Sequence, residues 1–207
     1  IVLPILEKTF ARSFEVQPLI STNLELNKKE RLRLTNDQMM ILKVLENRNR
    51  VAIKGGAGTG KTVIALEKAK RLAEEGLKTL LICYNRPLAD HLKISCKEVS
   101  NLHVMSFHYL CYSHSKRFNK ANPDRDVLKE AQKTYPGQDK FNLQLPTSLA
   151  LTADNPAFQF DAIVCDEGQD FKESWYKLLR CFLNKNGEML IAIDDKQNIY
   201  NQKKTSI

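Results

Sequence analysis

Long apolar runs are missing from this sequence of 207 residues. None approaches the roughly 20 residues that a membrane-spanning helix needs, and no signal peptide is visible, so we expect no membrane association. Paired cysteines are missing as well, because the five cysteines form no C-x-x-C pair. That usage is typical of free thiols in a reducing compartment, and it predicts a cytoplasmic protein.

Neither sign of charge is scarce, but the balance is basic. The 32 lysines and arginines outnumber the 24 acidic residues by eight, which is compatible with a polyanionic partner without identifying one. The hydrophobic share of 43% is that of an ordinary globular protein. The length allows one large domain, or one domain with an appendage. Because the first residue is Ile1 rather than Met, we expect a fragment of a longer chain.

Residues 55–62 read GGAGTGKT and match G-x-x-x-x-G-K-[ST] at every fixed place. An apolar strand is expected before them at 50–54 and a helix after them at 62–75. Glycines let backbone N–H groups point at phosphates, and the helix N-terminus adds positive charge. A glycine-rich turn with an incidental lysine is the alternative, and the strand, loop and helix in register argue against it. The residues expected to hold ATP in this loop are Gly55, Gly56, Ala57, Gly58, Thr59, Gly60, Lys61 and Thr62.

Strand and helix patterns alternate along the rest of the chain. Buried strands are expected at residues 78–83, 102–105, 160–166 and 188–193, with helical patterns between them. Such alternation is typical of a parallel sheet with crossover helices. The sequence therefore predicts an α/β P-loop fold, a mostly parallel sheet flanked by helices.

The pattern is weaker in two regions. Residues 1–34 carry apolar side chains without a long period, and we interpret them as an N-terminal arm or the remnant of a preceding domain. Residues 115–156 contain four prolines and many charges, with one helical piece near 126–134. We interpret them as a short polar insertion on the rim of the sheet. The ATPase domain is therefore expected to span residues 35–207.

Two acids follow the apolar strand expected at 160–166. Carboxylates at the carboxyl end of a parallel strand lie beside a phosphate loop, where open α/β sheets bind ligands. Asp166 is expected to hold Mg²⁺ through its water shell, together with the hydroxyl of Thr62. Glu167 is expected to orient and deprotonate the attacking water. Two incidental acids at a loop mouth are the alternative, which a complete phosphate loop makes less favourable.

Six motifs in a fixed order carry a more specific resemblance. Together they resemble the first RecA-like domain of superfamily 1 helicases of the UvrD/Rep kind, and most of all the compact helicases often found behind a NERD nuclease domain. The ordered set is far more specific than the phosphate loop alone. The matching segments are residues 36–38 (NDQ, the Q motif), 55–62 (motif I), 81–92 (LICYNRPLADHL, motif Ia), 104–108 (VMSFH, motif Ib), 166–170 (DEGQD, motif II) and 194–200 (DDKQNIY, motif III).

The resemblance implies roles for side chains outside the phosphate loop. It implies that Gln38 reads the adenine edge, and that Gln169 and Gln197 link the γ-phosphate to a nucleic-acid track. Lys61, Glu167 and Gln197 would be catalytic. Single-stranded DNA, or RNA, would contact motifs Ia, Ib and III. The side chains expected at that contact are Tyr84, Asn85, Arg86, Phe107, His108 and Tyr200.

The resemblance also implies a partner domain. Superfamily 1 motors hydrolyse ATP between two RecA-like domains, and the second supplies arginines that neutralise charge on the γ-phosphate. We expect that second domain to lie outside this chain, and the chain by itself to bind Mg²⁺ and ATP but to turn ATP over slowly.

Several residues depart from the usual motifs. Gly168 stands where motif II usually has alanine, and we expect it to loosen the turn. Val63 replaces an arginine after motif I, and Ile193 replaces the glycine of motif III.

Two other functions stay open: a stand-alone P-loop ATPase or nucleotide kinase, and a regulatory module without turnover. The glutamines at positions 38, 169 and 197 favour the helicase.

A metal site is a further alternative for His108, Cys111 and His114. On a helix, positions six apart diverge by more than half a turn, and the sequence offers no evident fourth ligand. We therefore expect these side chains to pack in the core.

Overall fold

Five parallel strands form one sheet in the order β1-β5-β4-β2-β3. This computed structural model describes residues 34–46 and 48–194. The predicted α/β P-loop fold with a parallel sheet flanked by helices is confirmed. The strands are β1 (Arg50–Gly55), β2 (Thr79–Cys83), β3 (Leu102–Ser106), β4 (Phe160–Cys165) and β5 (Leu183–Asp194).

The strand register brings several carboxyl ends to one edge of the sheet. Gly55 pairs with Asp194 at the ends of β1 and β5. Cys165 pairs with Ile191 on β5 and with Ile82 on β2. The phosphate loop after β1, the acids after β4 and the end of β5 are therefore neighbours, as a parallel sheet requires.

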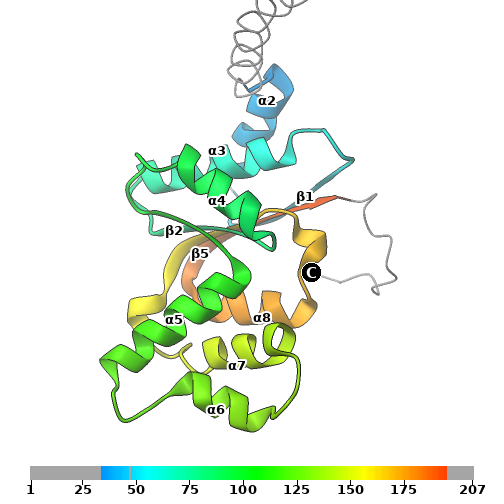
Figure 1. Ribbon diagram of the computed structural model, residues 1–207. Coiled ribbons are helices and arrows are strands. Elements are labelled where there is room, and N and C mark those ends of the chain that lie inside the picture. The colour runs from blue at the N-terminus through cyan, green and yellow to red at the C-terminus, as the bar shows by residue number, and fades with distance from the viewer. Residues whose placement is uncertain (1–33, 47, 195–207) are drawn as a thin grey trace, which may run out of the picture. The chain divides into compact units, whose positions relative to one another are not determined.

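Helices cover both faces of this sheet. Figure 1 shows α3 (Lys61–Glu74) and α4 (Arg86–Ser95) on one face, and α5 (Phe107–Ala121) and α8 (Glu173–Cys181) on the other. Most residues of the central strands β2 and β4 are apolar because both faces of these strands are buried. Every residue of β2 is buried, the polar Thr79 included. The larger core lies under α5 and α8, where Phe107, Trp175 and Phe182 are almost fully buried.

The insertion is more helical than predicted. Besides α6 (Val127–Thr134), which confirms the expected helical piece, it contains a π-helical turn at Lys140–Gln144 and α7 (Leu145–Ala150). We interpreted Pro146 as an interruption, but it lies in the first turn of α7, where the missing N–H costs nothing. Leu145 and Leu149 are buried, so this segment has an apolar face of its own against the domain.

Strand β5 begins earlier than predicted, at Leu183 rather than at residue 188. The sequence between them reads as a turn because it contains Gly187. That glycine permits a close approach: a Cβ there would lie 2.6 Å from Leu183 Cδ1 and 2.8 Å from the carbonyl oxygen of Asp161. A larger residue at this position would therefore displace the neighbouring strand.

Helix α2 (Asn36–Leu45) begins with two reciprocal hydrogen bonds between Thr35 and Gln38. The hydroxyl of Thr35 accepts a hydrogen bond from the backbone N–H of Gln38 at 3.3 Å, and Gln38 Oε1 accepts one from the backbone N–H of Thr35 at 3.0 Å. This is a capping box.

The chain divides into two compact units after Ile41, and all five strands belong to the second. Among the described helices, none combines the length and apolarity that crossing a membrane requires.

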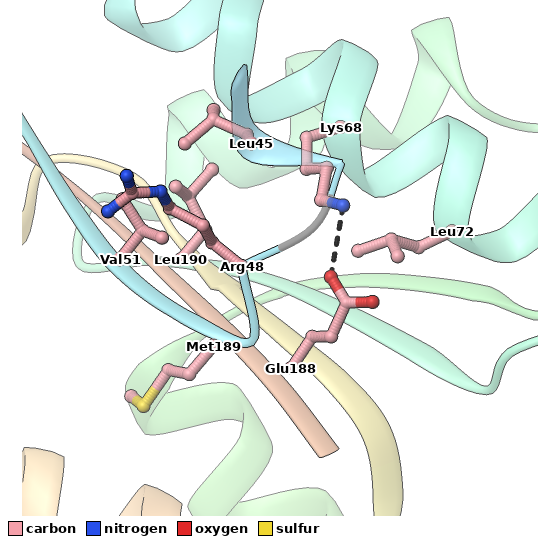
Figure 2. Close-up of a pocket in the computed structure, with 8 residues that line it drawn as sticks. All are labelled: Leu45, Arg48, Val51, Lys68, Leu72, Glu188, Met189 and Leu190. Atoms are coloured by element: carbon pink, nitrogen blue, oxygen red, sulfur yellow. Dashed lines mark ion pairs between the residues drawn. The ribbon is translucent and has the colours of Figure 1, made fainter. Parts of the chain in front are cut away.

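A buried ion pair joins α3 to β5 (Figure 2). Lys68 Nζ lies 2.9 Å from Glu188 Oε2, and the two side chains are 9% and 23% exposed. The small cavity beside this pair measures about 10 Å³ and is lined by Leu45, Leu72 and Met189 among others. It has room for one water at most, so the pair is structural and the cavity is no ligand site.

We expect the substitution Glu188→Gln to destabilise the domain. Removing the carboxylate leaves the ammonium of Lys68 buried and unpaired, which costs about 2 kcal/mol after allowance for the partial exposure of Glu188. Urea unfolding followed by circular dichroism measures the change. Glu173→Gln is the matched control, because Glu173 pairs with Lys177 on the surface, where the loss is about 0.5 kcal/mol or less. Equal losses in the two variants would contradict the assignment.

Candidate nucleotide-binding site

The phosphate loop connects β1 to α3 as the sequence predicts. Gly58 and Gly60 have φ angles of 78° and 84°, a left-handed conformation that glycine adopts without a Cβ clash. Gly60 caps α3, and the Thr59 hydroxyl donates a hydrogen bond to the carbonyl oxygen of Gly56 at 2.9 Å. The loop therefore turns back on itself at the N-terminus of α3, where anions are favoured.

Lys61 points into this loop. Its Nζ donates hydrogen bonds to the carbonyl oxygens of Gly55 at 2.9 Å and Gly56 at 2.7 Å. It also lies 3.4 Å from Asp194 Oδ2, and its side chain is 12% exposed. These partners hold the ammonium where the loop would receive phosphate groups.

Asp166 is buried beside the loop, at the carboxyl end of β4, with 2% of its surface exposed. Burial raises the pKa of its carboxyl, and the charge of Glu167 raises it further, while a hydrogen bond with Thr62 and the charge of Lys61 lower it. Within the described residues, Asp166 Oδ2 has no hydrogen-bond partner. A buried oxygen of this kind is costly unless it is satisfied.

Mg²⁺ fits this pair of oxygens. The Thr62 hydroxyl and the Asp166 carboxylate are oxygen ligands of the kind that Mg²⁺ prefers. The described part of the chain holds no group of three His, Cys, Asp or Glu side chains that could bind a metal by itself. Mg²⁺ characteristically binds to one or two protein oxygens and completes its shell with water and phosphate, so the donor set suits that ion together with a nucleotide.

Glu167 follows in a left-handed conformation, with φ 53° and ψ 47°. That conformation costs a non-glycine residue about 1–2 kcal/mol. Gln169 Nε2 donates a hydrogen bond to Glu167 Oε2, and Gln169 Oε1 accepts one from the backbone N–H of Asp194 at 2.8 Å. Gln169 therefore ties the expected general base to the end of β5.

A comparison with protein families settles the class of this site. The family model described as an AAA domain matches residues 38–203. The chain belongs to the AAA domain family. No curated protein matches it. The AAA domain is a P-loop domain of a kind found in UvrD/Rep-like helicases, and it suggests a nucleotide-binding motor with NTPase activity.

Gly168 of the AAA domain is tightly packed, so the expectation that it loosens the turn is wrong. A Cβ at this position would lie 2.6 Å from Ile191 Cγ2 and 3.0 Å from the carbonyl oxygen of Ala192. The hydroxyl of Tyr176 donates a hydrogen bond to the Gly168 carbonyl oxygen. Glycine therefore lets the turn after Glu167 press directly on β5.

Four of the residues expected to contact nucleic acid lie together. Tyr84, Asn85, Arg86 and His108 line one pocket of about 690 Å³ at the carboxyl ends of β2 and β3. The rest of its lining was missed in the sequence. Asp139, Phe141 and Asn142 come from the insertion, and Asp170 ends the turn that follows Glu167. The sequence offers no signal that separates Phe141 from a buried aromatic residue.

Phe107 does not belong to that pocket, and its assignment to nucleic-acid contact is wrong for this structure. It is fully buried, and its ring stacks on Trp175 with a centroid separation of 4.4 Å. Its position as the first residue of α5 directs it into the core under that helix. No face of its ring is available to a base.

The remaining predicted residues are placed only in part. Gln197 and Tyr200 lie outside the described residues, and the role of Gln38 stays a prediction. Cys111 and His114 are buried in the core as expected, whereas His108 is half-buried and lines the pocket. The His114 ring stacks on Phe158 at 4.7 Å, and burial lowers its pKa to about 4.

Nucleotide binding should depend on Lys61 but not on the charge of Glu167. Lys61→Ala removes the ammonium that faces the phosphates, and we expect ATP to bind at least about tenfold more weakly, or 1.4 kcal/mol. Glu167→Gln keeps the shape and the contact with Gln169, so binding should persist while turnover in the full-length protein is lost. Titration with a fluorescent ATP analogue measures both. An equal loss of binding in the two variants would contradict these roles.

Proposed function

We propose that this AAA domain is the N-terminal motor domain of an ATP-dependent superfamily 1 helicase or translocase of the NERD-associated kind. Its substrate is single-stranded nucleic acid, and we propose DNA rather than RNA. One observation carries the proposal. The turn Gly168–Asp170 bears Gln169 towards Glu167 and Asp194, and it places Asp170 in the wall of the pocket lined by Tyr84 and His108. One short turn therefore links the nucleotide site to a second site that suits another ligand.

The side chains of that pocket suit an unpaired base. Tyr84 is 42% exposed and Phe141 is 55% exposed. Both rings meet His108 edge to face, with centroid separations of 5.4 Å and 5.3 Å. Burial lowers the pKa of His108, and its Nε2 lies 3.1 Å from the Phe141 carbonyl oxygen. Aromatic rings of this kind contribute about 1–3 kcal/mol for each base that stacks on them.

Arg86 adds a cation for the phosphate backbone. Its side chain is 80% exposed and lies 3.7 Å from Asp90 in an exposed pair, which is weak enough to exchange for a phosphate. The net charge of +8 agrees with a polyanionic partner.

The site residues divide the work of ATP hydrolysis between them. Lys61 and the loop amides would bind the β- and γ-phosphates. Thr62 and Asp166 would hold Mg²⁺, and the ion would supply positive charge beside the phosphates. Glu167 would take a proton from the attacking water. The oxygen of that water bonds to the γ-phosphorus, and the bond between the γ-phosphorus and ADP breaks. Gln169 keeps Glu167 oriented, and its own turn continues into Asp170 in the wall of the neighbouring pocket.

Phe141→Ala should weaken binding of single-stranded DNA about fivefold or more, because one stacking surface is lost. Fluorescence anisotropy with a labelled oligodeoxynucleotide measures the affinity. Tyr109→Ala is the matched control: Tyr109 follows His108 on α5 and is 52% exposed, but it does not line the pocket. The control should bind like the wild type. Equal losses in both variants, or none in Phe141→Ala, would remove the pocket from the proposed track.

The ATPase activity of the full-length protein should rise when single-stranded DNA is added, and the affinity for DNA should fall steeply with salt as counterions are released. A steady-state ATPase assay with and without DNA tests the first point, and anisotropy between low and moderate salt tests the second. An ATPase rate that does not change when DNA is added, together with a DNA affinity that does not change with salt, would favour the stand-alone ATPase or nucleotide kinase.

A further inference from the structure

Two lysines on one face of α3 pair with two acids of β5. Lys61 and Lys68 are seven residues apart, which places them on the same side of a helix. Lys68 meets Glu188 at 2.9 Å (Figure 2), and Lys61 meets Asp194 at 3.4 Å. The Lys68 pair lies away from the phosphate loop, whereas the Lys61 pair involves the lysine that a nucleotide needs.

Asp194 and a triphosphate compete for one ammonium. The side chain of Asp194 is only 4% exposed, so water screens its charge poorly. When phosphate oxygens replace the present contacts of Lys61, the Asp194 carboxylate loses part of its neutralising charge. It also meets the negative charge of the incoming phosphates, and two like charges about 4 Å apart near a protein surface repel each other strongly.

Asp194 is connected to both residues that would lie beside the third phosphate, Lys61 and Glu167. The backbone N–H of Asp194 holds Gln169 Oε1, and Gln169 holds the carboxylate of Glu167. If Glu167 is to act on water beside the γ-phosphate, that phosphate must lie between Lys61 and Glu167. Asp194 contacts both sides of this space, directly at Lys61 and through Gln169 at Glu167.

We propose that Asp194 is the counter-ion that holds Lys61 in the nucleotide-free loop, and that the γ-phosphate displaces it, so that the end of β5 distinguishes ATP from ADP. This inference rests on nucleotide binding at the phosphate loop and needs no nucleic acid. The displacement occurs at the residue whose backbone anchors Gln169. A change in the partner of Lys61 therefore reaches Glu167 through two hydrogen bonds.

The variant Asp194→Asn tests the proposal, because it removes the charge and keeps the size. We expect a non-hydrolysable ATP analogue to bind about fivefold more tightly than it does to the wild type, with the affinity for ADP changed less than about twofold. Isothermal titration calorimetry with Mg²⁺ gives both constants. An unchanged ratio of the two affinities would overturn the proposal, and so would weaker binding of the ATP analogue, which would show that Asp194 helps to hold the metal.

Glu188→Gln is the matched control, since it breaks the other pair between α3 and β5. It should lower the unfolding midpoint and leave the ratio of ATP to ADP affinity unchanged. A similar change of that ratio in this control would overturn the proposal, because the effect would then come from packing of α3 on β5. If the wild-type protein binds neither ATP nor ADP, that result would contradict both the nucleotide site and this proposal.

A measurement on the wild type covers the case in which Asp194→Asn does not fold. Hydrogen exchange at the backbone amide of Asp194, followed by mass spectrometry, should change when the ATP analogue is added and stay unchanged with ADP. Equal protection with the two nucleotides would overturn the proposal. The DNA-binding measurements do not affect this expectation, even if the wild-type protein binds no DNA. A failure of the proposed nucleic-acid function is therefore distinguishable from a failure of the proposal for Asp194.

Discussion

The position of β5 between β1 and β4 is the constraint on which the site depends. Because all three strands run parallel, their carboxyl ends lie at one edge, and Gly55, Asp166 and Asp194 become neighbours although they are far apart in the sequence. The phosphate loop supplies the cation of Lys61 to this edge, and the other two strands supply carboxylates. The cleft at such an edge is where open parallel sheets bind ligands.

Negative charge accumulates at that edge, and this shapes the chemistry of the site. Asp166 is buried, one of its oxygens has no hydrogen-bond partner among the described residues, and burial raises its pKa. Asp194 is buried as well and shares Lys61 with the carbonyl oxygens of the loop. Buried carboxylates are costly unless they are paired or bind a metal, so the arrangement favours a ligand that brings a divalent cation. Mg²⁺ together with ATP meets that requirement.

The insertion extends the site beyond the sheet. Both α6 and α7 pack on α5, and Leu145 and Leu149 of α7 belong to the same buried cluster as residues of α5. The π-helical turn between α6 and α7 carries Phe141 to the ring of His108. A segment that is polar in composition therefore contributes an aromatic wall beside the motifs. Its Asp139 caps the turn by accepting hydrogen bonds from the backbone N–H groups of residues 141 and 142, which holds the wall in place.

The sequence by itself determined the phosphate loop, the acids after β4 and the parallel α/β class, because each is written in local spacing and apolar periodicity. It did not determine that Phe107 is buried while Phe141 is exposed, since an aromatic residue has the same local signal in either place. Nor could it show that Asp194 holds Lys61 or that Gly168 is tightly packed. Those contacts join strands distant in sequence, and only the strand order and register of the folded sheet decide which side chains meet.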